Sequence, residues 1–396
     1  MKKHYFFVII LIITVLTACG TSAAPAPTET SLPQVTVATA TQPPAQTEII
    51  SDPTEEAPVP SPQIDPTPAP EAIATVVQNL QTPWEIVFLP DGRMLITERP
   101  GTLILIDTEG VRIPITDVVE RGESGLLGLA LHPDFEENQW LYLYLTYEAN
   151  SIMLNRVERY HFDGTNLSDS MIIIDKIPGA ANHDGGRIEF GPDGLLYVTT
   201  GDAEVSYSAQ DVNSLAGKIL RLHDDGSIPQ DNPFGNAVYS YGHRNPQGLA
   251  WDEQGRLWST EHGPSGLGSG FDELNLIEIG GNYGWPVIQG DQSQEGMISP
   301  QLHSGGSETW APGDIEIAEG TAYFVGLRGA SLYSVSLNDI HAESLHRNFV
   351  NEFGRLRALR LGPDGLLYMG TSNTDGRGSI RTGDDKIFRV DPLQLP

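Results

Sequence analysis

The sequence has one cysteine, Cys19, among its 396 residues, so no disulfide bond can form within the chain. It is also poor in basic residues, because 23 Lys and Arg stand against 52 Asp and Glu, which gives a formal net charge of −29. No basic stripe is left to neutralise phosphates, and this excludes nucleic acid and anionic lipid surfaces as main partners. Long helical periodicity is missing too: "AQDVNSLAGKILRL" allows at most one turn before a strand.

The first nineteen residues have the pattern of an export signal. A basic start precedes an apolar run from Tyr5 to Leu16, which is short for a membrane span. Its end, "LTAC", resembles a bacterial lipobox, in which cleavage leaves the cysteine to carry diacylglycerol. We therefore expect residues 1–19 to be a lipoprotein signal and Cys19 to be the lipid anchor. The protein would then face the periplasm or the exterior; an uncleaved signal anchor is the alternative.

Residues 20–71 are dominated by Pro, Thr, Ala and Ser, with acidic residues and without Lys or Arg. Such a segment buries too little apolar surface to offset its ordering entropy. We expect a disordered, semi-extended tether that holds residues 72–396 away from the membrane.

One phrase recurs in residues 72–396, as "FLPDGRMLITE" (88–98), "FGPDGLLYVTT" (190–200), "WDEQGRLWSTE" (251–261) and "LGPDGLLYMGT" (361–371), with a relative at 131–146. Each copy joins an apolar residue, a Pro/Asp/Gly turn and a strand-like run, which is typical of a β-hairpin. The intervals of roughly 43 to 60 residues, doubled once, suit a β-propeller blade of about four strands. The sequence predicts an all-β fold with six blades.

Loops at one end of a propeller converge on its axis, and several loops here carry reactive side chains. "NHDGG" offers Asn182 and His183 before a strand, and histidine can act as a general base near neutral pH. "YGHRNP" offers Arg244 and Asn245. In "GRLR", Arg355 and Arg357 are two residues apart, so both could reach one anionic ligand. The loop "EHGPSGLGSGFDELNLIEIGGNYGWP" is rich in oxygen ligands of the kind that Ca²⁺ prefers.

Taken in this order, "NHDGGRIEFGPDGLLYVTTGD", "YGHRNPQGLAW", "EHGP…DELNLIEIGGNYGWP" and "GRLR" are similar to the motifs of the glucose/sorbosone dehydrogenase family. The resemblance extends from about Thr75 to Asp391. It implies a six-bladed propeller that binds pyrroloquinoline quinone, a planar tricarboxylate, together with Ca²⁺. Members oxidise the C1 hydroxyl of aldoses to give lactones. The electron acceptor is not implied, and the oligomeric state stays open, although some members dimerise.

The resemblance also implies a role for each matching residue. His183 would be the general base, and Asn182 would contact the sugar. The residues that would hold the cofactor are Arg244, Asn245, Arg355 and Arg357, and those that would bind calcium are Gly263, Pro264, Glu273 and Tyr283.

Some positions depart from the glucose-type pattern. Glu123 stands where those enzymes carry a cofactor-contacting Gln, and a carboxylate beside a tricarboxylate is unfavourable unless it is protonated or paired. Arg328 falls near a family lysine that contacts the cofactor. Ala203 and Glu204 stand where a sugar-contacting Gln is found. These changes favour an aldose-type relative over a strict glucose enzyme.

Plainer interpretations exist for the same residues. His183 alone would be a solvated turn histidine, Arg355 and Arg357 could pair with surface acids, and Trp84 and Trp285 are expected in blade cores. Two other functions also remain: a cofactor-free, surface-displayed carbohydrate-binding propeller, and a calcium-dependent lactonase. The arginine cluster argues against the lactonase, whose metal site needs carboxylate and Asn ligands.

Overall fold

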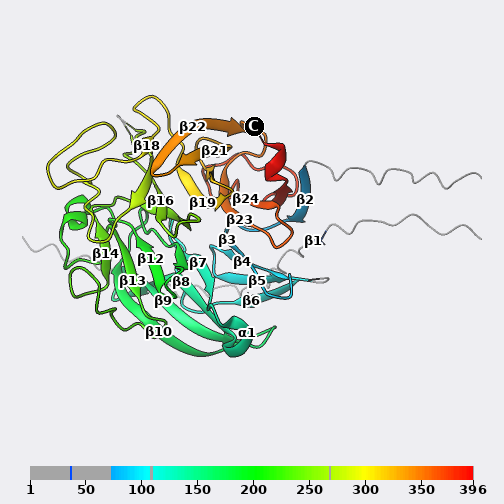
Figure 1. Ribbon diagram of the computed structural model, residues 1–396. Coiled ribbons are helices and arrows are strands. Elements are labelled where there is room, and N and C mark those ends of the chain that lie inside the picture. Colours follow the sequence, from blue (N-terminus) through cyan, green and yellow to red (C-terminus); the bar gives the residue numbers. More distant parts are fainter. Residues whose placement is uncertain (1–35, 38–72, 108–109, 267–268, 396) are drawn as a thin grey trace, which may run out of the picture. The chain divides into compact units, whose positions relative to one another are not determined.

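The computed structural model describes residues 36–37, 73–107, 110–266 and 269–395 (Figure 1). The expected signal, the lipid anchor at Cys19 and nearly all of the expected tether lie outside these residues. Within them, no helix has the length and the apolar character needed to cross a membrane.

Six β-sheets make up the fold, and this confirms the predicted six-bladed propeller. Five sheets are formed by four consecutive strands each: β3–β6, β7–β10, β11–β14, β15–β18 and β19–β22. Figure 1 shows the first strands β3, β7, β19 and β23 near the centre, with later strands such as β10 and β22 farther out.

The strands of the first three blades are β3 (Pro83–Phe88), β4 (Met94–Glu98), β5 (Thr102–Ile106), β6 (Val111–Pro114), β7 (Leu126–Leu131), β8 (Trp140–Ala149), β9 (Ile152–Phe162), β10 (Leu167–Pro178), β11 (Ile188–Phe190), β12 (Leu196–Thr200), β13 (Lys218–Leu222) and β14 (Val238–Tyr241). Those of the fourth and fifth blades are β15 (Pro246–Trp251), β16 (Leu257–Glu261), β17 (Glu273–Ile277), β18 (Leu302–His303), β19 (Pro312–Ala318), β20 (Thr321–Gly326), β21 (Ser331–Asn338) and β22 (His341–Asn348). The described helices are one-turn segments, α1 (Phe135–Asn138), η1 (Ser206–Gln210) and η2 (Pro392–Gln394).

The sixth blade joins the two ends of the folded part. Its strand order is β1 (Thr36–Val37), β2 (Ile73–Gln78), β25 (Ile387–Val390), β24 (Leu367–Thr371) and β23 (Leu356–Leu361). Strand β2 pairs with β25 in antiparallel register, so the ring is closed by hydrogen bonds between distant parts of the chain. The repeat pattern did not predict this closure.

The recurring phrase forms a β-hairpin, as predicted. In the structure this hairpin joins the first and second strands of a blade. In the first of them, Gly92 N–H donates to the Leu89 carbonyl at 2.8 Å, and the Asp91 carboxylate accepts the Arg93 N–H at 3.0 Å. Gly92 has φ +86°, which favours glycine. The fifth blade explains the doubled interval, because its β19–β20 turn at Glu319–Gly320 lacks the Pro-Asp pair.

Alternating side chains of each strand pack against two neighbouring blades. In β8, Leu141, Leu143 and Leu145 join a core with the first blade, while Tyr142 and Tyr144 join a core with the third. The innermost strands approach closely at Gly128, where a β-carbon would lie 2.3 Å from the Gly186 carbonyl oxygen. The result is a rigid ring whose loops are held in fixed positions.

Candidate active site

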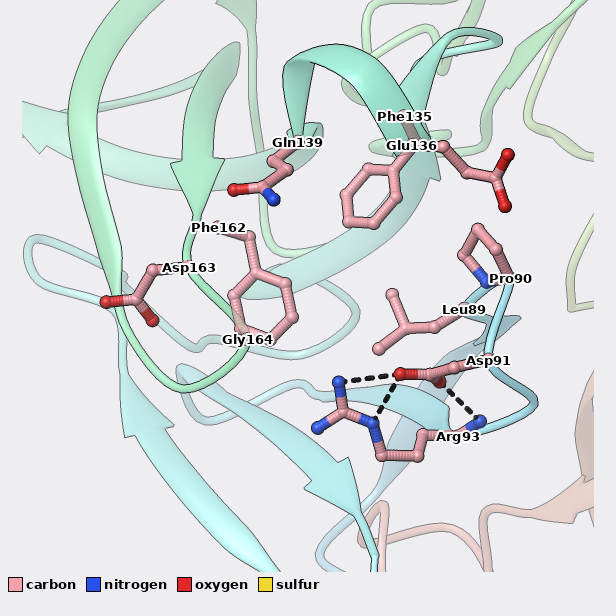
Figure 2. A pocket seen from close by; sticks show the side chains of 10 residues that line it. All are labelled: Leu89, Pro90, Asp91, Arg93, Phe135, Glu136, Gln139, Phe162, Asp163 and Gly164. Carbon is pink, nitrogen blue, oxygen red and sulfur yellow. Dashed lines mark hydrogen bonds and ion pairs between the residues drawn. The ribbon is translucent and has the colours of Figure 1, made fainter.

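Many of the predicted site residues come from the loops that precede the first strand of a blade or follow its second strand, whereas Arg357 lies in β23 and Glu273 begins β17. His183 precedes β11, Arg244 and Asn245 precede β15, and Glu123 precedes β7. The Pro/Asp/Gly turns lie at the other ends of these strands. A groove near those turns, lined by Leu89, Phe135 and Phe162 among others, contains none of the predicted site residues (Figure 2).

The His183 ring is held in a fixed orientation by two neighbours, one at each nitrogen. Its Nδ1 lies 2.8 Å from Asp202 Oδ1, and its Nε2 lies 2.8 Å from Arg244 Nη2. Asp202 in turn accepts the Trp285 indole N–H at 2.9 Å. Because the Asp202 carboxylate can only accept a hydrogen bond from Nδ1–H and the Arg244 guanidinium can only donate one to Nε2, the two partners select the tautomer with the proton on Nδ1 and a lone pair on Nε2. Nε2 is therefore the basic atom of this site.

The backbone of His183 is constrained as well. Its φ is 64°, in the left-handed region that few non-glycine residues occupy. The turn packs directly on the end of β12, since a β-carbon at Gly201 would lie 1.8 Å from the His183 carbonyl oxygen. The glycine in "TTGD" is thus required by the position of His183.

Two buried arginines of the site lack a carboxylate partner among the described residues. Arg244 donates to the Ser265 hydroxyl at 3.0 Å, to the His262 carbonyl at 3.3 Å and to His183. Arg357 donates to the Gln247 side chain, while its Nε has no partner. Burial lowers the pKa of Arg357 to about 9, despite the attraction of Glu123. Burial also lowers the pKa of Arg244. An anionic ligand would compensate both charges.

Arg355 differs from Arg357 although the two are close in sequence. Arg355 forms an ion pair with Asp375 at 2.8 Å. Arg328 is exposed between β20 and β21 and makes no hydrogen bond or ion pair with any residue that the structure describes. Asn245 is buried: its Oδ1 accepts the Gly185 N–H at 2.9 Å, and its Nδ2 has no partner. The structure therefore brings Arg244, Asn245 and Arg357 to the buried part of the site, and leaves Arg328 at the surface.

The four expected calcium ligands line one cavity, together with Arg244 and Trp285. The Gly263 loop is fixed by Asp272, whose carboxylate accepts the N–H groups of Gly263, Trp310 and Ala311 at 2.6 to 3.0 Å. The Tyr283 hydroxyl donates to the Leu276 carbonyl at 2.6 Å and accepts the Glu278 N–H at 2.7 Å, so this hydroxyl is already engaged both as donor and as acceptor.

Glu273 is the ionisable member of this cavity. Burial, reinforced by Glu261, raises the pKa of Glu273 to about 8. The described residues include no cluster of three or more His, Cys, Asp or Glu side chains that could hold a metal. A cation here would therefore rely on the backbone oxygens of Gly263 and Pro264 beside the Glu273 carboxylate, which is an oxygen donor set that suits Ca²⁺.

Two site residues were missed by sequence reasoning. Arg377, in the loop between β24 and β25, donates to Glu123 at 2.6 Å and to Asn182 at 2.7 Å. Trp285, expected in a blade core, is instead half-buried, bonded to Asp202, and lies with its ring centroid 5.5 Å from Arg244 Cζ. The aromatic turn "NYGWP" was a signal for Trp285. No pattern around Arg377 indicated its role.

Most of the chain matches one known protein family. The family model described as glucose / sorbosone dehydrogenase matches residues 80–381. The chain belongs to this family. It is 31% identical over 347 residues to the aldose sugar dehydrogenase of Escherichia coli, covering 78% of this chain and 92% of that protein. Two of its relatives are thus named as an aldose sugar dehydrogenase and a quinoprotein glucose dehydrogenase, which supports assignment as an oxidoreductase.

Solved structures of the family are similar along the whole propeller. A putative oxidoreductase (glucose dehydrogenase) from Thermus thermophilus has a TM-score of 0.77 and 44% identity, covering 80% of this chain and 98% of that one. The pyrroloquinoline quinone-bound aldose sugar dehydrogenase of Streptomyces coelicolor has a TM-score of 0.75 and 38% identity, covering 81% of this chain and 99% of that one.

Proposed function

We propose that this protein is a pyrroloquinoline quinone-dependent dehydrogenase that oxidises the C1 hydroxyl of aldoses to give lactones. The observation that carries the proposal is the pair of buried guanidinium groups, Arg244 and Arg357, without a carboxylate partner among the described residues. A planar tricarboxylate provides the missing negative charge. The orphaned buried atoms Arg357 Nε and Asn245 Nδ2 are donors that such a ligand can satisfy.

When bound, the quinone supplies the hydride acceptor of the reaction. The chain's own part is to move one proton and to stabilise charge. His183 Nε2 takes the proton of the sugar hydroxyl, and Asp202 stabilises the imidazolium through Nδ1 at 2.8 Å. Arg244 Nη2 lies 2.8 Å from His183 Nε2, so this contact would have to be released before Nε2 could accept the substrate proton, and Arg244 would then be available to an anionic ligand.

Calcium is the second part of the proposal. Gly263, Pro264, Glu273 and Tyr283 would hold Ca²⁺ at the cavity wall next to Arg244. There the cation would polarise a carbonyl oxygen of the ligand. Export and a lipid anchor at Cys19 also remain proposals. They can be checked by metabolic labelling of the wild-type chain and a Cys19→Ala variant with a radiolabelled fatty acid.

The decisive experiment follows dye reduction by the purified protein over a panel of aldoses, with quinone and Ca²⁺ added separately and together. We expect sugar-dependent reduction that requires both additives. His183→Gln should lower kcat by about 10²- to 10⁴-fold while quinone affinity changes little, because only the general base is removed. His132→Gln is the matched control, since His132 lies in the β7–β8 turn at the far end of its blade.

If the quinone fails to bind with Ca²⁺ present, the cofactor assignment falls and the cofactor-free sugar-binding alternative becomes the better one. If quinone binds and no aldose is oxidised, the substrate class is wrong. Lactone hydrolysis that depends on Ca²⁺ and not on quinone would favour the lactonase.

A further inference from the structure

A single arginine, Arg377, connects two loops at the mouth of the site. One of its terminal nitrogens donates to Glu123 Oε1 at 2.6 Å, and the other donates to Asn182 Oδ1 at 2.7 Å. Its own loop, between β24 and β25, belongs to the sixth blade, whereas Glu123 and Asn182 precede β7 and β11. The planar guanidinium thus bridges three blades through an ion pair with Glu123 and a hydrogen bond to Asn182.

Glu123 continues this connection to the general base. Its second oxygen, Oε2, accepts the backbone N–H of His183 at 3.0 Å. The left-handed backbone of His183 has an intrinsic energetic cost and persists only where neighbours hold it. Glu123 holds the His183 backbone, and Arg377 holds Asn182 beside it. Asn182 is fixed from the other side by a 2.7 Å bond from its Nδ2 to Glu204.

The ion pair between Arg377 and Glu123 also affects the electrostatics of the site. Burial opposes ionisation of Glu123, but the charges of His262 and Arg377 and the His183 N–H together lower the pKa of Glu123 to about 2. Arg377 forms an ion pair with Glu123, with 2.6 Å between its Nη1 and Glu123 Oε1. Without it, an ionised carboxylate would face the anionic ligand expected at Arg244 and Arg357.

We propose that Arg377 is a positioning residue that fixes the Asn182–His183 turn and cancels the Glu123 charge, so that an anionic cofactor is tolerated beside a carboxylate. The inference rests on the proposed function. It explains how this chain carries Glu123 at a position next to a tricarboxylate: the carboxylate is paired instead of protonated. Arg377 acts through Glu123 and Asn182 and not by contact with reacting atoms.

The test compares Arg377→Gln, Arg377→Lys, Glu123→Gln and the double variant Arg377→Gln/Glu123→Gln with the wild type. Arg381→Gln is the matched control, because Arg381 lies on the same loop and donates to the Asn351 and Glu352 carbonyls instead. Quinone affinity is measured with Ca²⁺ by quenching of tryptophan fluorescence. Amide hydrogen exchange at His183 is measured on the cofactor-free protein, and thermal unfolding checks that each variant folds.

We expect Arg377→Gln to weaken quinone binding by roughly 10- to 30-fold, and to speed exchange at His183 several-fold. Arg377→Lys, which keeps the charge, should recover most of the affinity, and so should the double variant, which removes the uncompensated carboxylate. Arg381→Gln should behave as the wild type does.

The proposal is overturned if Arg377→Gln leaves affinity and exchange unchanged. It is also overturned if neither the lysine nor the added Glu123→Gln recovers the affinity, since Arg377 would then contact the cofactor itself. If the wild type binds no quinone, the proposed function fails, and exchange at His183 alone decides whether Arg377 positions the turn.

Discussion

Two buried arginines, Arg187 and Arg357, lie against the same tryptophan and have opposite surroundings. Their Cζ atoms are 4.3 and 5.6 Å from the ring centroid of Trp84. Arg187 forms ion pairs with Glu85 and with Asp314, the latter at 3.1 Å. Arg357 has an uncharged partner, Gln247. Sequence alone does not separate them, because each is an arginine at the start of an inner strand. The difference in partners separates a cation that holds blades together from one that is available to a ligand.

The strongest test of this comparison is Arg187→Met. It leaves Glu85 without its closest counter-charge and Asp314 without its ion-pair partner, and both carboxylates are almost fully buried. We expect the free energy of unfolding to fall by about 3–5 kcal/mol, as when one partner of a buried ion pair is removed. Urea unfolding measures the change. A loss under about 1 kcal/mol would mean that Arg187 is not a structural cation.

The matched substitution, Arg357→Met, should have little effect on stability and a large effect on quinone binding. Removing a buried charge without a carboxylate partner should leave the free energy of unfolding within about 1 kcal/mol of the wild type. Quinone affinity should nevertheless fall by at least about 30-fold, which corresponds to about 2 kcal/mol. Fluorescence titration and urea unfolding of the same samples provide both values. Equal destabilisation by Arg187→Met and Arg357→Met would remove the distinction.

A buried carboxylate extends the comparison to negative charge. Asp184 Oδ1 accepts the Asn155 side chain at 3.0 Å and the Ala180 N–H at 3.1 Å, while its Oδ2 has no partner. Burial raises the pKa of Asp184 to about 7, against an ordinary value of 3.8. Between these values the folded state binds more protons than the unfolded state. Stability from this group is therefore present below about pH 4 and is lost as pH rises through 7.

Asp184→Asn should remove this slope, which is at most about 1.4 kcal/mol per pH unit for one proton. Urea unfolding of wild type and variant from pH 4.5 to 7.5 measures it as a difference, so that other titrating groups cancel. Parallel curves for the two proteins would show that Asp184 is ionised throughout.

The fold was predictable because its signal is local and repeated. Each Pro/Asp/Gly turn fixes one hairpin by its own hydrogen bonds, and the period then gives the blade size. The fifth blade's turn carries no such motif, yet the doubled interval still predicted it. Closure through β2 and β25 was not predictable, because that pairing depends on the ring as a whole and on no pattern in either strand.

The candidate site was predictable where a loop motif carries its own geometry. The glycines around His183 and the Arg244–Asn245 pair are of this kind. The interaction partners of the site residues were not predictable. The motif "GRLR" does not indicate that Arg355 forms an ion pair with Asp375 while Arg357 lacks a carboxylate partner. Arg377 was missed for the same reason, since its partners lie 254 and 195 positions away.

The pairing of β2 with β25 also has a consequence for the order of events in synthesis. Val77 and Ile387 are register partners separated by roughly 310 residues, so the edge of β2 that pairs with β25 stays unpaired until residues 387–390 have been synthesised. A nascent chain would expose an unpaired strand edge throughout this period, and such edges promote aggregation. Completion of the ring is therefore a late step, which has to wait until the strands of all six blades have been synthesised.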